Sequence, residues 1–271
     1  MNQTPGALDA TEVHRHLTSD MWVRIETAAE TGSTSDDAAA LARAGTPHGT
    51  AVLASRQTDG RGRLGRRWES PAGGVYVSAV VRPMLPAADL TALPLAVAVG
   101  VAGAITRLGG DARVKWPNDV LVSGGKVAGV LLELNAAGGR ADWLVIGVGL
   151  NVSRPLGGHT EGRTYLADHV RCISCTKAAA MILDGIAEGY RLLVDDGVGA
   201  IRGALGVQDV LSGSEVTVRE ADGSVLARGR AEGIDDVGRL LLAGEDGRMR
   251  AIASGDVTLR DTRRGPQESR P

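Results

Sequence analysis

"TDGRGRLGRRW", residues 58–68, is the stretch on which the interpretation of this chain depends. It holds four arginines and three glycines, and it lies between two runs typical of strands, "TAVLASRQ" at 50–57 and "GGVYVSAVVRP" at 73–83. Four guanidinium groups in one loop repel one another unless an anion joins them, and glycine leaves the backbone N–H groups free to surround that anion. We therefore expect a loop that binds a small anion.

The same letters fit two other patterns. Residues 60–65 match the dinucleotide pattern G-x-G-x-x-G, but the loop-like "RRWESPAGG" follows, where a dinucleotide site needs a helix. Arginine–glycine tails that bind RNA are long and repetitive, whereas this run is short and set between strands. A solvated surface hairpin without function is the remaining alternative. The sequence has no Walker pattern G-x-x-x-x-G-K-[ST], so an ATP site in it would be of another type.

The composition is that of a soluble globular protein, with 43% hydrophobic and 23% charged residues among 271. A formal net charge of −2 gives no overall basic field that would draw the chain onto nucleic acid. The N-terminal residues lack the basic region and apolar core of a secretory signal. Residues 90–108 are apolar but rich in Ala and Gly, which predicts a buried helix rather than a membrane span. We expect a cytoplasmic protein.

The two cysteines, Cys172 and Cys175, do not suggest a disulfide framework. Their C-x-x-C spacing lacks the ligand set of a zinc site and the βαβ setting of a redox site. We interpret both as incidental.

The predicted fold class is α/β (α+β): a mixed β-sheet with flanking helices, followed by a small β-barrel. Strand and helix signals alternate up to about residue 205, and beyond it short alternating strands are joined by Asp-Gly turns. The expected divisions are a flexible N-terminal segment, the α/β domain, the barrel domain and a disordered tail, at residues 1–20, 21–205, 206–260 and 261–271.

Four further motifs follow one another in a fixed order around the arginine–glycine loop. They are "GSTSD" at 32–36, "KWPNDVLV" at 115–122, "GGKVAGVLLEL" at 124–134 and "GVGLNV" at 147–152. Each alone has a plain structural explanation, since Pro, Asn and Asp favour turns and glycines mark bulges. Together, in this order and spacing, they closely resemble the biotin protein ligases over residues 30–152.

This resemblance implies an α/β catalytic domain followed by an SH3-like β-barrel. It also implies ATP-dependent biotinylation of one lysine on a biotin carboxyl carrier domain, such as that of acetyl-CoA carboxylase, through biotinyl-5′-AMP. Only residues 1–31 precede "GSTSD", which is too few for the winged helix of the bifunctional ligase–repressors. We therefore expect the monofunctional type, without DNA binding. A lipoate or octanoate ligase or transferase of the same fold is the alternative.

The biotin site expected from the resemblance begins with small polar side chains. Ser33, Thr34 and Gln57 can supply hydroxyl and amide partners to a ureido ring. Ser35 stands where the family more often has Asn. The full expected biotin set is Ser33, Thr34, Ser35, Gln57, Gly60, Arg61, Gly62, Arg63, Lys126, Gly129 and Gly149.

The expected nucleotide site is cationic. Adenylate formation brings a carboxylate against a polyphosphate, so positive charge must be placed where negative charge gathers. By resemblance Lys126 is the key catalytic lysine, and Arg63 and Arg66 assist it as catalytic residues. Asp119 is a candidate ligand for the Mg²⁺ that accompanies ATP. The expected ATP and adenylate set is Arg63, Arg66, Trp68, Lys115, Asn118, Asp119, Lys126 and Asn151.

The expected partners are biotin carboxyl carrier domains, with no DNA and no membrane. Relatives of this kind often dimerise when the adenylate orders their loops, so we expect either a monomer or a ligand-dependent homodimer.

Overall fold

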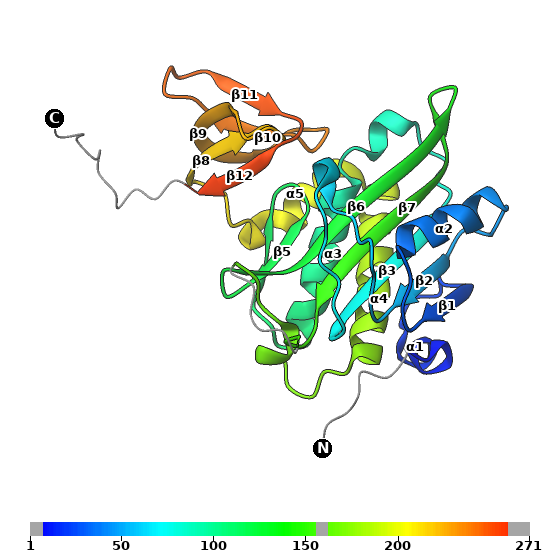
Figure 1. Cartoon of the computed structure of the whole chain (residues 1–271). Helices are drawn as coiled ribbons and strands as arrows, with labels where there is room; N and C mark the ends of the chain where they lie inside the picture. Colours follow the sequence, from blue (N-terminus) through cyan, green and yellow to red (C-terminus); the bar gives the residue numbers. More distant parts are fainter. Residues whose placement is uncertain (1–7, 156–161, 260–271) are drawn as a thin grey trace.

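The computed structural model describes residues 8–155 and 162–259, and it divides into two sheets with helices around the larger one (Figure 1). The larger sheet has seven strands in the order β1-β2-β3-β7-β6-β5-β4. Its strands are β1 (Arg24–Ala28), β2 (Thr50–Ala54), β3 (Gly74–Val81), β4 (Ala112–Lys115), β5 (Asp119–Val122), β6 (Gly125–Ala137) and β7 (Arg140–Asn151). The helices are α1 (Ala10–His16), α2 (Thr34–Arg43), α3 (Leu93–Arg107), α4 (Cys175–Val194) and α5 (Gly197–Leu205).

The larger sheet is mixed, as predicted. β1 and β2 run parallel, and the other neighbouring strands run antiparallel. Successive side chains of a strand point to opposite faces. On β7, Leu144, Ile146 and Val148 join one core with α3 and α4, whereas Val145 joins a second, smaller core with α2. Helices therefore flank both faces of the sheet, but α2 covers only part of its own face.

A second sheet of five antiparallel strands forms the C-terminal part of the described chain. Its order is β11-β10-β9-β8-β12. The strands are β8 (Glu215–Arg219), β9 (Val225–Ile234), β10 (Leu240–Ala243), β11 (Met249–Ile252) and β12 (Asp256–Leu259). A separate small β unit is thus confirmed, while its SH3-like closure and the division at residue 206 stay predictions.

The turn between β9 and β10 fastens the small sheet to the larger domain. Trp116 Nε1 donates a hydrogen bond to the carbonyl of Gly238 at 3.0 Å, and Thr91 Oγ1 donates to that of Val237 at 3.2 Å. Arg202 Nε donates to the carbonyl of Ile234 at 3.1 Å. These bonds come from three different segments of the larger domain, so the position of the small sheet is tied to the motif "KWPND" from which Trp116 comes.

The expected flexible N-terminal segment is corrected for residues 8–20. Asp9 caps α1, and Val13 is fully buried. Beyond the helix, the buried carboxylate of Asp184 on α4 accepts hydrogen bonds from the backbone N–H groups of Thr18 and Ser19 and from the Thr18 hydroxyl. The segment is anchored because a buried carboxylate needs such donors. Residues 1–7 and the predicted tail at 261–271 lie outside the described residues.

The predicted buried helix is α3, which packs against α4 with very little space between the two backbones. The stretch Ala87–Arg107 is long and apolar enough to cross a membrane by composition, but 72% of its apolar window is buried inside the protein. Gly100 of α3 faces Gly185 and Gly189 of α4. A Cβ added at Gly100 would collide with the carbonyl oxygen of Gly185 and lie 2.8 Å from the nitrogen of Gly189.

We predict that Gly100→Ala destabilises the protein by about 1–3 kcal/mol, because the added methyl group must push two backbones apart in a packed core. Gly103→Ala on the same helix is the control, since its nearest neighbour is a flexible Arg107 nitrogen at 3.6 Å. That change should be neutral or stabilise by up to about 1 kcal/mol through helix propensity. Urea unfolding of both variants measures the difference, and equal stabilities would contradict the proposed close contact.

Candidate functional site

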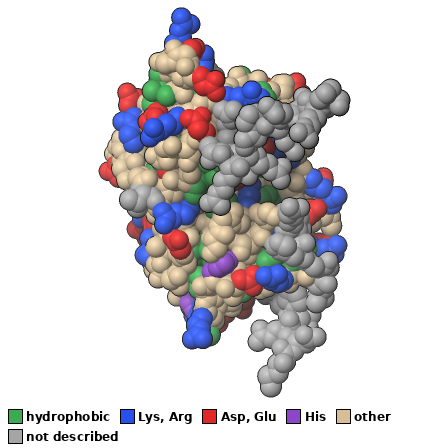
Figure 2. Space-filling view, turned by 90° about the vertical axis from the view of Figure 1, so that its left-hand side faces the viewer, with side chains coloured by type: hydrophobic (Ala, Val, Ile, Leu, Met, Phe, Trp, Pro, Cys, Tyr) green, Lys and Arg blue, Asp and Glu red, His purple; other side chains and the backbone are tan. Residues whose placement is uncertain are grey.

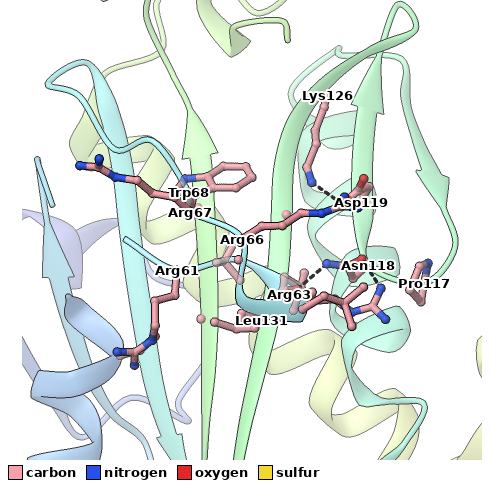
Figure 3. A pocket seen from close by; sticks show the side chains of 18 of the residues that line it. Arg61, Arg63, Arg66, Arg67, Trp68, Pro117, Asn118, Asp119, Lys126 and Leu131 are labelled. Atoms are coloured by element: carbon pink, nitrogen blue, oxygen red, sulfur yellow. Dashed lines mark hydrogen bonds and ion pairs between the residues drawn. The ribbon is translucent and has the colours of Figure 1, made fainter. Parts of the chain in front are cut away.

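A pocket of about 260 Å³ lies on the α2 face of the larger sheet, beside the N-terminus of that helix (Figure 3). The arginine–glycine loop forms one wall, and residues of the β4–β5 turn and β6 form another. The start of β12 also lines it, through Gly255, Asp256 and Val257. Both sheets therefore contribute residues to one cavity.

The floor of the pocket has few side chains. Gly147 and Gly149 of β7 lie at alternate positions on the pocket face, and Gly129 of β6 pairs with Gly149. Ser78 of β3 pairs with Gly147. The three glycines leave a strip of backbone without side chains that runs from Ser78 towards Lys126.

One end of this strip is a network of neutral polar groups. The backbone N–H of Thr34 donates to Gln57 Oε1 at 2.9 Å, and the Thr34 and Ser78 hydroxyls are 2.8 Å apart. The Ser35 hydroxyl lies 3.1 Å from that of Ser78. Ser33 is the N-cap residue of α2, but its side chain makes no capping hydrogen bond. The predicted residues of this end are therefore brought together, with Ser78 added to them.

Trp68 occupies the middle of the strip. A Cβ added at Gly149 would lie 2.6 Å from Trp68 Cε2, and one at Gly129 would lie 3.1 Å from Cζ3. Both glycines still line the pocket, and the indole packs against them from above, so their part in binding a ligand stays a prediction. The Trp68 Nε1 atom is buried and has no hydrogen-bond partner. The neighbours of the ring are instead the backbone of Gly149 and Gly129 and the ammonium of Lys126.

The arginines of the loop are separated by internal partners, which corrects the expectation that their repulsion awaits an external anion. Arg61 pairs with Asp36 of α2 and Glu133 of β6, at 2.7 and 2.8 Å, and its hydrogen bond to Asp36 raises its pKa. Figure 3 shows its guanidinium turned away from Lys126.

The partners of the other arginines lie in the β4–β5 turn, at the start of β12 and in the loop itself. Arg63 Nη1 donates to Asn118 Oδ1 at 3.1 Å, and burial lowers the pKa of Arg63. Arg66 pairs with Asp256 of the small sheet at 2.9 Å, and Arg67 donates to the carbonyl of Thr58.

The other end of the strip is charged. Lys126 Nζ lies 2.5 Å from Asp119 Oδ1 and 5.1 Å from the centroid of the Trp68 ring. Asn118 Nδ2 donates to the carbonyl of Val130 at 2.7 Å, which fixes the turn that presents Asp119. Lys115 lines the same wall. The expected catalytic lysine is thus next to the expected carboxylate, as Figure 3 shows.

Asp119 is a single carboxylate rather than part of a metal-binding cluster. Among residues 8–155 and 162–259, no group of three or more His, Cys, Asp or Glu side chains could hold a metal ion. Mg²⁺ commonly takes one or two protein carboxylates and completes its shell with water and substrate phosphates. Asp119 fits that role, and Mg²⁺ binding stays a prediction.

Two predicted residues support the pocket from behind instead of lining it. Gly60 accepts a hydrogen bond from the backbone N–H of Trp68 at 2.9 Å, and a Cβ there would lie 2.5 Å from the Trp68 carbonyl oxygen. Asn151 Nδ2 donates to the carbonyl of Lys126 at 3.2 Å. The first therefore shapes the loop and the second holds the backbone of the lysine.

Several residues that line the pocket were not predicted, among them Ser78, Arg163 and Asp256. A signal for Ser78 was present, since it is the one polar residue inside the apolar strand run "VYVSAVV". Arg163 and Asp256 follow no local pattern, and only the folded chain brings them to the loop.

The chain matches the Biotin/lipoate A/B protein ligase family over residues 31–151 and the Biotin protein ligase C terminal domain over residues 211–260. It is 36% identical to a biotin–[acetyl-CoA-carboxylase] ligase of Paracoccus denitrificans over 234 residues, which cover 82% of this chain and 95% of the relative. It is 32% identical to the bifunctional ligase/repressor BirA of Bacillus subtilis, with coverages of 94% and 80%. A biotin protein ligase from Aquifex aeolicus, solved in complex with biotin and ATP, superposes with a TM-score of 0.71 at 28% identity, covering 89% of this chain and 99% of the other.

We predict that Gly149→Ala displaces the Trp68 indole, because the new methyl group and the ring cannot share the floor. The measurement is the tryptophan emission assigned to Trp68, obtained by subtracting the spectrum of a Trp68→Phe partner in each background. The emission should move to longer wavelength as the ring meets water. Gly147→Ala is the control, since its methyl group would meet the rotatable Ser35 hydroxyl at 3.2 Å. An unchanged Trp68 spectrum in Gly149→Ala would contradict the prediction.

Proposed function

The chain belongs to the biotin protein ligase family, and we propose that it joins biotin to one lysine of a biotin carboxyl carrier domain in an ATP-dependent reaction. The carrier domain of acetyl-CoA carboxylase is the expected substrate, in keeping with the name of the Paracoccus relative. One observation carries the proposal. The pocket has a neutral polar end and a cationic end, joined by a strip of glycine backbone under an aromatic ring. Biotin has the matching parts: a ureido head, an apolar body and a carboxylate tail.

The reaction has two steps. A biotin carboxylate oxygen attacks the α-phosphorus of ATP, and the bond between this phosphorus and the oxygen that bridges to the β-phosphate breaks. Pyrophosphate is released, and the product is biotinyl-5′-AMP. The ε-amine of the carrier lysine then attacks the acyl carbon of this mixed anhydride. The amine loses a proton and the bond between the acyl carbon and the phosphate oxygen breaks. AMP is released, and the product is biotinyl-lysine.

The neutral end suits the ureido head. Thr34, Ser35 and Ser78 offer hydroxyl groups that can donate or accept, and Gln57 offers an amide. They are already hydrogen-bonded to one another, so their positions are set before a ligand arrives. Of the carrier-modifying reactions of this family, biotin attachment uses these groups best. A lipoyl or octanoyl chain has no ureido group to pair with them.

The charged end suits the first chemical step. Negative charge gathers where the carboxylate meets the α-phosphate, and the ammonium of Lys126 lies at that end of the strip beside Trp68. Asp119 holds the ammonium in place at rest. With ATP bound, Asp119 and the phosphates would hold Mg²⁺, which would neutralise phosphate charge. Arg63 and Arg66 would hold phosphate oxygens from the loop side.

The small sheet would close the side of the pocket at which the nucleotide binds. Asp256 pairs with Arg66, and Gly255 and Val257 line the cavity next to it. We therefore assign to this domain a part in ATP binding as well as in receiving the carrier.

The remaining expectations concern partners and place in the cell. A monofunctional ligase that does not bind DNA stays a prediction. On the face shown in Figure 2, basic and acidic side chains are interspersed, in keeping with the net charge of −2. A cytoplasmic location and a monomeric or ligand-dependent dimeric state stay predictions.

The direct test is to incubate the chain with ATP, Mg²⁺, labelled biotin and a carrier domain, and to find the label by mass spectrometry. We expect it on one carrier lysine, and none on a carrier in which that lysine is arginine. Labelled lipoate is the matched competitor. Transfer of lipoate at the rate of biotin would favour the alternative function, and no transfer of either would contradict both.

We predict that Lys126→Ala lowers the rate of biotinyl-AMP formation by about two to three orders of magnitude, the scale for loss of one preorganised charge-stabilising donor. Biotin affinity without ATP should fall much less, because the polar end at Thr34 and Gln57 is intact. Lys126→Arg should restore little, since a planar guanidinium does not reproduce a compact ammonium. Single-turnover adenylate formation is the measurement. A normal rate in Lys126→Ala would remove Lys126 from the catalytic machinery.

A further inference from the structure

Arg163 is a cation of the pocket that lies beside Lys126. Its side chain is only 23% exposed, and its guanidinium carbon lies 6.0 Å from the centroid of the Trp68 ring, against 5.1 Å for Lys126 Nζ. Two cations from separate segments thus face one indole. Two cationic side chains this close together form a site that favours an anion.

The backbone fixes this arrangement. The N–H of Lys126 donates to the carbonyl of Gly162 at 2.9 Å, and the N–H of Thr164 donates to the carbonyl of Lys126 at 3.0 Å. Arg163 and Lys126 therefore form an isolated parallel β-bridge and lie directly beside each other. Its place at the charged end of the pocket does not depend on its own ion pair.

The counter-ion of Arg163 is loosely held. Its Nη2 lies 3.0 Å from Glu69 Oε2, and the Glu69 side chain is 60% exposed. Among the ion pairs that the described pocket residues make, this one joins the least exposed cation to the most exposed carboxylate. By contrast, Lys126 and Asp119 are 30% and 20% exposed.

This asymmetry has an energetic consequence. A mostly buried guanidinium has lost much of its hydration and needs an anionic partner. A carboxylate in water gives such a partner weakly, because solvent screens the attraction. A phosphate that enters the pocket can therefore replace Glu69 at little cost.

We propose that Arg163 binds the phosphate of the acyl-adenylate next to Lys126, and that Glu69 is the resting counter-ion which this phosphate replaces. The inference rests on the proposed function. A guanidinium can bind two phosphate oxygens at once, which complements the single charge of the Lys126 ammonium. Arg163 would then stabilise both the adenylate and the charge that gathers as it forms.

The test uses two variants of the full chain whose effects should have opposite signs. Arg163→Ala should raise the KM for ATP in biotin-dependent pyrophosphate release by about tenfold or more, the scale for one hydrogen-bonded charged group. Glu69→Gln keeps the size of the side chain and removes the competing charge. It should lower that KM by about two- to fivefold, the scale for an exposed ion pair. Arg163→Lys should recover part of the loss.

Biotin affinity without ATP, measured by calorimetry, should be unchanged in both variants. If the pair only fastened residue 69 to the neighbouring segment, both substitutions would raise the KM for ATP together. That result, or an unchanged KM in Arg163→Ala, would overturn the inference. If the unaltered chain releases no pyrophosphate in response to biotin, that result would instead contradict the proposed function. It would be seen before any variant is compared.

Discussion

Ion pairing inside the pocket is the constraint on which the rest of this molecule depends. The described lining residues include seven cationic side chains and two carboxylates. Such a group of like charges would push the loop out into solvent unless partners held it. The partners come from α2, β5, β6 and β12, through Asp36, Asp119, Glu133 and Asp256. Pairing therefore ties one loop to the helix, the sheet and the small domain.

These pairs position more than they stabilise. Most are partly exposed, and pairs of that kind contribute little to the free energy of unfolding. Their weakness suits a binding site, because an incoming polyanion can exchange with the carboxylates without unfolding the wall. The neutral end behaves differently. The hydroxyls of Thr34 and Ser78 are buried and already paired, so that end is rigid while the charged end can rearrange.

Much of the polar end and of the lysine end could be predicted from the sequence, because their residues sit in short local motifs. Ser33 and Thr34 lie at the start of α2, and Lys126 lies at the start of β6. The sequence next to these residues is enough to predict both elements. The orientation of Arg61 could not be predicted in this way, since it depends on Glu133, far away along the chain. Arg163 and Asp256 reach the pocket only through strand pairing and domain docking. The N-terminal helix was missed for the same reason, because a buried carboxylate on α4 anchors the segment that follows it.

In the proposed reaction, the two ends of this pocket hold biotin and the phosphates of ATP, so that biotin becomes an acyl-adenylate. The exchange of labelled pyrophosphate into ATP measures that reversible step without any carrier protein. We expect exchange that requires both biotin and Mg²⁺ and that lipoate does not support. Exchange that proceeds equally well with lipoate, or that is absent when biotin is present, would contradict it.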